Sequence, residues 1–143
     1  MLYFDTSALV KLFSDEQGSK LVRRLISNPS NAIWVLELAL IEMICTVYRK
    51  HRNNEVHEDS LETILTAIEQ QFRSFRVIPL ASDVVAESKE LMKQFGSKFG
   101  LRTLDALHIA GFSLFAEPEW TFVSSDKNQL HVVEQLDYPI ISV

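Results

Sequence analysis

Short apolar runs alternate with longer helical stretches along the whole chain, and this alternation constrains the fold more than any other feature. Strand-like runs end at Phe4 and recur at residues 33–35, 75–80, 120–123 and 140–143. Helical spacing of apolar side chains separates them, over residues 7–13, 17–26, 36–52, 56–72, 82–95, 103–115 and 127–135, with a loop at 96–100. Strands that alternate with helices build a mainly parallel sheet covered on both faces. The sequence therefore predicts an α/β fold.

The composition fits one compact domain over residues 1–143. Hydrophobic residues make up 47% of the chain, which is enough for a substantial core. With 4 Gly and 4 Pro, no flexible linker stands out. The apolar stretches are interrupted well before the roughly 20 residues that a membrane span needs, and no basic region precedes the first one, so neither a span nor a signal peptide is expected.

Charge and cysteine content restrict the setting further. The single cysteine, Cys45, excludes an intramolecular disulfide and fits a reducing cytosol, which predicts a cytoplasmic protein. The net charge of −5 argues against broad nucleic-acid binding driven by charge alone. A local basic groove beside an acidic pocket remains compatible with it.

The first apolar run stops at an acid that is followed by two small hydroxyl residues. Asp5 comes directly after Phe4, and Thr6 or Ser7 is placed to begin a helix. Ligands of open α/β sheets gather at the carboxyl ends of strands, which makes Asp5 a candidate metal ligand. The competing interpretation is that Asp5 simply caps the following helix.

Three further acids stand where the pattern predicts burial. Glu42 interrupts an apolar helical run, Asp105 lies in a helix with little polar face, and Asp126 follows a strand. Each has a local explanation: a solvent-exposed helix face for Glu42, an ion pair with Arg102 for Asp105, and a turn or helix cap for Asp126. Because an isolated buried carboxylate must neutralise, pair or bind a cation, one shared pocket explains all of them more simply.

Four clustered carboxylates suit Mg²⁺ or Mn²⁺. Such ions can hold and activate water beside a phosphodiester and stabilise the leaving oxygen. No convincing serine–histidine–acid constellation is present. His108 is close enough to Asp105 in sequence to touch the pocket, but a hydrogen-bonded structural histidine is favoured. Cys45 is predicted to be a small core residue rather than a nucleophile.

Four segments, in this order, resemble the PIN-domain ribonucleases, especially the VapC-like toxins of type II toxin–antitoxin systems. They are residues 2–12, 38–42, 100–110 and 122–127, and the third is the most specific. The resemblance implies a three-layer PIN-like fold and endonucleolytic cleavage of RNA with Mg²⁺ or Mn²⁺. It also implies a homodimer and an antitoxin that occludes the site.

Matched position by position, the resemblance assigns catalytic and metal-binding roles to Asp5, Glu42, Asp105 and Asp126. Ser7 becomes a supporting polar residue, and Ser124 keeps a hydroxyl where the family often has threonine. Leu36 departs from the family, in which many members have a small polar residue. Glu37 lies on a different helical face from Glu42 and receives no metal role.

An RNA strand needs basic contacts beside these acids. The candidates are Lys11, Arg49, Arg52 and Arg102, with Lys50, His51 and Lys98 nearby. Residues 49–52 also fit the solvated carboxyl end of a helix, where positive charge is favourable. An acidic antitoxin tail is an alternative partner for the same side chains.

Three other functional classes are considered. An aspartate-based phosphatase commonly has a second Asp two residues after the first, and Ser7 occupies that position. A receiver domain pairs acids at the first strand end, and no such pair is present. A catalytically silent PIN-like module that binds RNA or protein is the third possibility, and the presence of all four acids argues against it. The prediction is a metal-dependent endoribonuclease that acts as a toxin.

Overall fold

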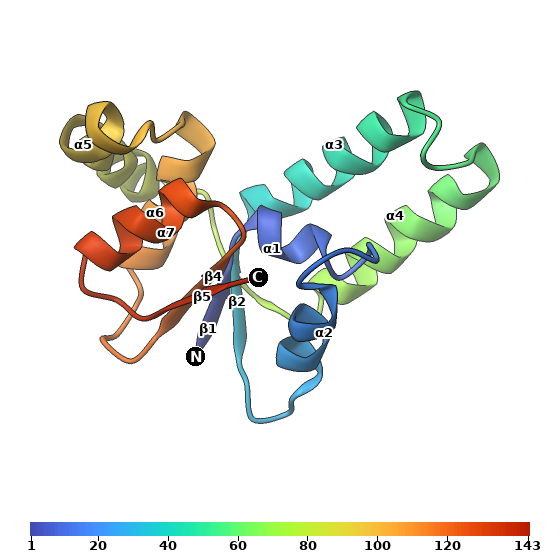
Figure 1. Ribbon diagram of the computed structural model, residues 1–143, viewed down its shortest axis with the longest axis horizontal. Coiled ribbons are helices and arrows are strands. Elements are labelled where there is room, and N and C mark those ends of the chain that lie inside the picture. Colours follow the sequence, from blue (N-terminus) through green and yellow to red (C-terminus); the bar gives the residue numbers. More distant parts are fainter.

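The computed structural model describes residues 1–143 and contains one parallel sheet of five strands (Figure 1). The strands are β1 (Leu2–Phe4), β2 (Ile33–Leu36), β3 (Arg76–Ile78), β4 (Thr121–Ser124) and β5 (Ile140–Ser142). They lie in the order β3-β2-β1-β4-β5, and every neighbouring pair is parallel. The predicted α/β fold with a parallel sheet is confirmed.

Seven helices cover the two faces of this sheet. They are α1 (Thr6–Val10), α2 (Ser19–Ser27), α3 (Leu38–Arg52), α4 (Glu58–Phe72), α5 (Ser82–Phe99), α6 (Thr103–Ser113) and α7 (Lys127–Gln135). Helices α5, α6 and α7 lie on one side of the sheet and α1 to α4 on the other, and α3 and α4 form a long hairpin (Figure 1). None of the helices combines the length and apolar composition that a membrane crossing requires.

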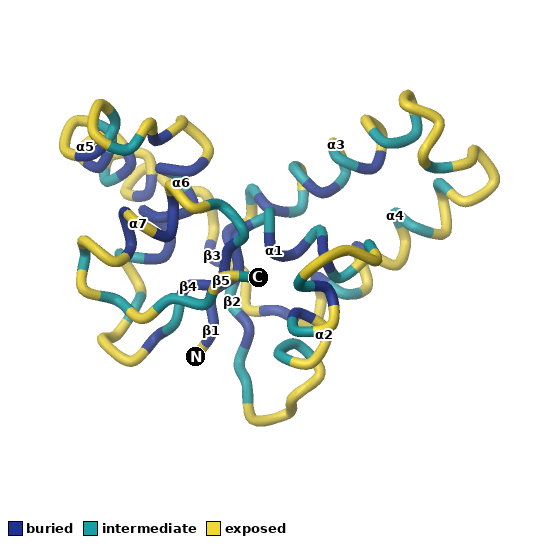
Figure 2. Tube along the Cα trace, viewed as in Figure 1, coloured by how far each residue is buried: buried dark blue, intermediate teal, exposed yellow.

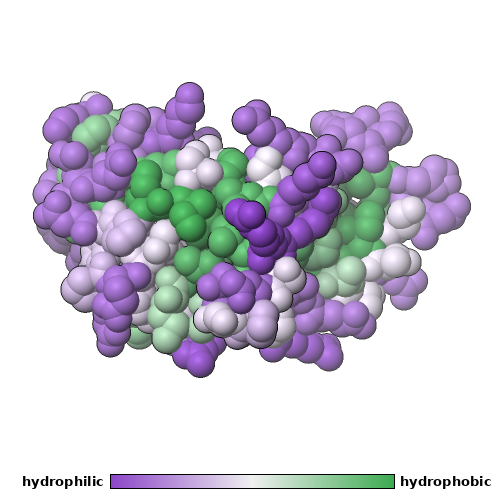
Figure 3. Space-filling model, turned by 60° about the horizontal axis from the view of Figure 1, so that its bottom comes forward, coloured by the Kyte–Doolittle hydropathy of each residue, from purple (hydrophilic) through white to green (hydrophobic).

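The alternation of side chains along the strands divides the core into two clusters. Tyr3 packs with α5, α6 and α7, whereas the next residue, Phe4, packs with α1 to α4. The Tyr3 ring lies 5.4 Å from that of Phe112 and 5.3 Å from that of Phe122, measured between centroids. Burial is concentrated on the sheet and on the inward faces of the helices (Figure 2), and apolar residues gather along the middle of the molecule (Figure 3).

The register of the central strands brings two chain segments together at the carboxyl edge of the sheet. Phe4 of β1 pairs with Val123 of β4, and the Asp5 amide donates to the Val123 carbonyl at 3.2 Å. Asp5 and Ser124, the residues that follow this pair, therefore lie side by side at the edge of the sheet. The fold thus places the start of α1 next to the start of α7.

Two local predictions are wrong. Helix α5 continues through Gly96 and ends at Gly100, whose left-handed φ of 63° stops it, so residues 96–99 are not a loop. Phe95 and Phe99, with ring centroids 6.0 Å apart, hold this last turn together. Cys45 is exposed rather than buried, because the inward face of α3 carries Met43 and Val47 at helical spacing and Cys45 lies between them on another face.

Candidate active site

One cavity of about 490 Å³ at the carboxyl edge of the sheet collects all of the predicted acids. Of the 16 residues that line it, one is hydrophobic. The acids among them are Asp5, Glu16, Glu42, Asp105 and Asp126. Glu37 is not in the cavity, and its carboxylate accepts from the Leu80 amide instead.

The four predicted acids occupy two depths. Asp5 and Asp105 are 1% and 6% exposed and are called the floor acids. Glu42 and Asp126 keep 21% and 20% of their side chains exposed and are called the rim acids. A cation that reached the floor would therefore lose most of its contact with bulk water.

Asp5 is both a helix cap and a wall of the cavity. Its Oδ1 accepts from the Ala8 amide at 3.0 Å, which caps α1, and its Oδ2 accepts from the Ser7 hydroxyl at 2.8 Å. Ser7 Oγ also lies 3.2 Å from Ser124 Oγ and accepts from the Ser125 amide at 3.0 Å. The two expected supporting hydroxyls thus join the segment after β1 to the segment after β4.

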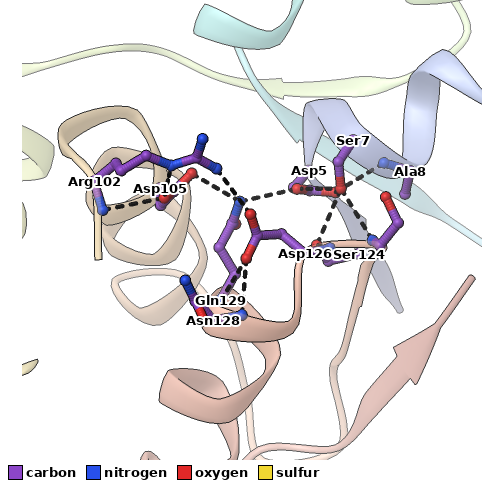
Figure 4. Close-up of polar contacts among 10 residues, drawn as sticks. Asp5, Ser7, Ala8, Arg102, Asp105, Ser124, Asp126, Asn128 and Gln129 are labelled. Atoms are coloured by element: carbon purple, nitrogen blue, oxygen red, sulfur yellow. Dashed lines mark hydrogen bonds and ion pairs between the residues drawn. The ribbon is translucent and has the colours of Figure 1, made fainter. Parts of the chain in front are cut away.

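Gln129 connects the floor acids, although nothing in the sequence singles it out. Its Nε2 donates to Asp5 Oδ2 at 3.0 Å and to Asp105 Oδ1 at 3.2 Å (Figure 4). The residue is only 3% exposed, which is unusual for glutamine. In sequence it is one polar position of a short helix, so only its distance of three residues from Asp126 hinted at a place near the pocket.

Arg102 joins the floor to the rim. Its Nε donates to Asp105 Oδ2 at 3.0 Å, and its terminal nitrogen donates to Asp126 Oδ2 at 2.8 Å (Figure 4). The Arg102 side chain is 71% exposed, so it reaches over the cavity from solvent. The local ion pair considered for Asp105 is present, and Asp105 lines the shared cavity as well.

Asp126 caps a helix, as the local interpretation predicted, and it also lines the cavity. Its Oδ1 accepts from the amides of Asn128 and Gln129 at 2.8 and 3.2 Å, which caps α7. Its own amide donates to Ser124 Oγ at 2.9 Å. The cap fixes the carboxylate at the cavity mouth, facing Arg102.

Glu42 is held by a separate polar group. His108 Nε2 lies 2.6 Å from Glu42 Oε2, and the Thr6 hydroxyl donates to the same oxygen. His108 is 2% exposed, and its Nδ1 lies 3.5 Å from the Tyr3 hydroxyl. His108 is therefore hydrogen-bonded, as predicted, and it also lines the cavity.

The surroundings shift the pKa values of a floor acid and a rim acid in opposite directions. Burial raises the pKa of Asp5, although the nearby His108 and the hydrogen bonds from Ala8 and Ser7 partly offset it. Burial also acts to raise the pKa of Glu42, but the hydrogen bond and charge of His108, with the Thr6 hydroxyl, outweigh it and leave that pKa lowered. A charged Asp5 is thus poorly compensated by the protein, whereas a charged Glu42 is well compensated.

Three of the four basic side chains expected to contact RNA line the cavity: Lys11, Arg49 and Arg102. Lys50 joins them, whereas Arg52 is exposed at the end of α3 outside the cavity. The Lys11 ammonium donates to the Gln17 carbonyl at 2.6 Å and lies 3.9 Å from Glu16. His51 binds the Val56 carbonyl and Glu58, so it belongs to the α3–α4 connection.

The residue types fit a hard divalent cation. Carboxylates dominate the floor and rim, and the buried Oε1 of Gln129 has no hydrogen-bond partner, which leaves one neutral oxygen free to accept. As arranged here, no three His, Cys, Asp or Glu side chains stand close enough together to hold an ion. The N–H groups of Arg102 and Gln129 take up oxygens of both floor acids in this arrangement.

The fold and the cavity together define the class of this protein. It is a three-layer α/β domain with acids at the carboxyl edge of its sheet. The sequence matches the PIN domain over residues 2–133, and the chain therefore belongs to the PIN domain family. No curated protein matches the sequence significantly.

Solved structures share the fold over nearly the whole chain. FitAcB from Neisseria gonorrhoeae is similar with a TM-score of 0.74 and 14% identity, over 99% of this chain and 97% of that one. VapC20 from Mycobacterium tuberculosis, described as a toxin that cleaves the sarcin-ricin loop, has a TM-score of 0.69 and 14% identity over 92% and 94%. VapBC2 from Rickettsia felis, bound to a promoter DNA fragment, has a TM-score of 0.67 and 15% identity over 100% and 99%. The resemblance to VapC-like PIN proteins is confirmed at the level of the fold.

Proposed function

We propose that the protein is a Mg²⁺- or Mn²⁺-dependent endoribonuclease and the toxin of a type II toxin–antitoxin pair. The observation that carries this proposal is the convergence of Asp5, Glu42, Asp105 and Asp126 on one polar cavity, from segments far apart in the sequence. Membership in the PIN family supports nuclease activity and the use of a metal, since PIN domains are generally nucleases and PIN nucleases typically use divalent metals. A toxin with the same fold is described as cleaving an RNA loop, which supports RNA as the substrate.

In this proposal Asp5, Glu42, Asp105 and Asp126 would hold the ion, which when bound would supply an activated water and stabilise the leaving oxygen. Ser7 keeps the Asp5 carboxylate directed into the cavity, and His108 and Thr6 keep Glu42 ionised and fixed. Lys11 and Arg49 line the cavity and bind phosphates of the RNA strand. Arg52 lies beyond the cavity and contacts a more distant phosphate.

We also propose an antitoxin partner and a homodimer. Similar structures include a toxin–antitoxin complex from Klebsiella pneumoniae, with a TM-score of 0.67 and 14% identity. Exposed apolar side chains near the cavity support a protein partner: Ile41, next to Glu42, is 63% exposed, and Leu104, next to Asp105, is 45% exposed. A toxin that cuts cellular RNA would act in the cytoplasm, where that RNA is.

The experiment that tests the activity compares cleavage of total bacterial RNA by purified protein with Mg²⁺, with Mn²⁺ and with EDTA. We expect cleavage with either metal, none with EDTA, and none by Asp5→Asn or Asp105→Asn. Asp137→Asn is the matched control, because Asp137 is exposed and its left-handed φ of 63° suits asparagine. Equal cleavage by the wild type and both floor variants would contradict the proposal.

A second candidate is a PIN module that binds RNA or protein without cleaving it. The ion pair of Asp105 with Arg102 favours this alternative, since the guanidinium occupies a carboxylate oxygen that a metal would use. The same assay separates the two functions, because a silent module retains RNA in a binding assay and releases no fragments with either metal. The phosphatase alternative loses support, because Ser7 binds the Asp5 carboxylate rather than serving as a second acid.

A further inference from the structure

We propose that Gln129 is a positioning residue of the cavity, with two separate tasks. Its amide nitrogen holds the two floor acids in place, and its Oε1 accepts a hydrogen bond from water bound to the divalent cation. This inference rests on the proposed metal-dependent function. It concerns a residue on α7 that is neither an acid nor part of the motifs that resemble the PIN family.

The contacts of Gln129 determine which way its amide faces. Ionised carboxylates accept hydrogen bonds and donate none, so Asp5 and Asp105 must both face the nitrogen of the amide. That nitrogen carries two hydrogens, and the two carboxylates account for both. The oxygen is therefore bonded to neither floor acid.

The side-chain oxygen of Gln129 has no partner of its own in the protein. Oε1 is buried, lies in a residue that lines the cavity, and has no hydrogen-bond partner in the protein. Buried polar atoms are nearly always paired, so an exception at a proposed reaction site calls for an explanation. A metal-bound water is a strong donor and is expected in Mg²⁺ sites, which usually keep several waters.

The local sequence explains why this side chain is free for such a role. Gln129 is the third residue of α7, where glutamine commonly turns back to bind the amide of the cap residue. Here the Asp126 amide already donates to Ser124 Oγ at 2.9 Å. The Gln129 side chain can therefore extend to the floor, and it is the one side chain that donates to both Asp5 and Asp105.

Replacing Gln129 has different effects if the residue supports the metal site and if it makes a merely structural contact. A structural tether would change the stability of the fold and leave the affinity of the folded protein for metal as it was. A residue that sets the floor acids and binds a water of the ion would change the affinity itself. Removal of groups that support metal ligands typically weakens metal binding about 10–100-fold.

The test measures Mn²⁺ affinity by electron paramagnetic resonance of the free ion, on the wild type, Gln129→Met, Gln135→Met and Asp5→Asn. Gln129→Met keeps the side-chain length and removes both the donors and the acceptor. Gln135 lies on the same helix, is exposed, and provides the matched control. We expect the dissociation constant to rise at least about tenfold in Gln129→Met and to stay unchanged in Gln135→Met.

Melting curves in EDTA establish whether each variant is folded. If Gln129→Met does not fold, Gln129→Asn is tested in its place. The shorter side chain cannot span both acids, so weaker Mn²⁺ binding is expected there too. Wild-type affinity in a folded Gln129 variant, even one with a lowered melting temperature, would overturn the inference alone. A wild type that binds no Mn²⁺, or an Asp5→Asn protein that binds it equally well, would overturn the proposed metal site and this inference with it.

Discussion

Asp5 on the floor of the cavity and Glu42 on its rim carry the same chemical group in opposite electrostatic settings. On the floor, Asp5 is buried and receives hydrogen bonds mainly from neutral donors, the Ser7 hydroxyl, the Ala8 amide and Gln129. On the rim, Glu42 contacts His108 and Asp126 contacts Arg102, which are both able to carry positive charge. Burial accordingly raises the pKa of Asp5, whereas the contact with His108 leaves the pKa of Glu42 lowered.

For the proposed function, this difference indicates which acid the cation would contact. The charge of Glu42 is stabilised by the protein itself, so that residue can serve as a fixed, ionised group. The charge of Asp5 is opposed by burial, and in the proposed function a metal ion would compensate it. Asp105 stands between these cases, because it receives hydrogen bonds from both Gln129 and Arg102.

The largest expected effect comes from comparing one floor acid with one rim acid. Asp105→Asn should lower the RNA cleavage rate more than about 100-fold, and Asp126→Asn only about 10-fold, because Asp126 lies at the more exposed rim, where water can replace its oxygen. Asparagine caps helices as well as aspartate does, so α7 stays intact in Asp126→Asn. Cleavage rates under single-turnover conditions make the comparison, and equal losses would remove the distinction between floor and rim.

The next effect concerns the histidine that keeps the rim acid ionised. His108→Leu removes the hydrogen bond and charge that oppose burial, so the pKa of Glu42 rises from its lowered value. The acid limb of the pH–rate profile should then move to higher pH, with a larger loss of activity near about pH 5 than near about pH 8.

A less severe change at the same position separates the hydrogen bond from the charge. His108→Gln keeps a side-chain N–H donor without a positive charge, and it should recover part of the activity on the acid side. His131→Gln, at an exposed histidine of α7, serves as the control and should leave the profile unchanged. A His108→Leu profile that falls equally at all pH values would contradict the proposed effect on Glu42.

The smallest expected effect is on stability without metal. Because the pKa of Asp5 is raised in the folded protein, its ionised form opposes folding at neutral pH, and stability from this group increases as the pH falls through that raised value. In EDTA at neutral pH, Asp5→Asn should therefore melt a few degrees above the wild type. The difference in melting temperature between Asp5→Asn and the wild type should disappear at acid pH and change sign when Mg²⁺ is added.

Circular-dichroism melting curves provide the measurement. Asp137→Asn should match the wild type throughout, because Asp137 is exposed. A lower melting temperature for Asp5→Asn in EDTA at neutral pH would show that the floor acid is already compensated by the protein, and the contrast with the rim would fail.

Much of the fold followed from periodicity and strand ends. Helix α7 begins and ends at the expected residues 127 and 135, and the parallel sheet places Asp5 and Asp126 at one edge, as the apolar runs before them indicate. Gly96 was misassigned because glycine marks both loops and tolerated helix positions. Only the backbone conformation shows that Gly100 is the one that ends α5.

Less of the detailed arrangement of the cavity could be predicted from the sequence. The local alternatives for Asp5, Asp105 and Asp126, two caps and an ion pair, all exist and are compatible with a shared cavity. Gln129 and Gln135 are both polar positions of the same helix, and only three-dimensional packing buries the first and exposes the second. The double contact of Arg102 likewise depends on how α6 and α7 meet, which residue spacing does not encode.

Anomalous diffraction from a crystal of the wild-type protein soaked in Mn²⁺ shows directly whether the cavity binds a divalent ion. We expect an anomalous peak in the cavity, in contact with a carboxylate oxygen of Asp5 or Asp105, and no such peak in Asp5→Asn crystals treated in the same way. A fully soaked wild-type crystal with no peak in this cavity, or with manganese only at other acids, would contradict the proposed metal site.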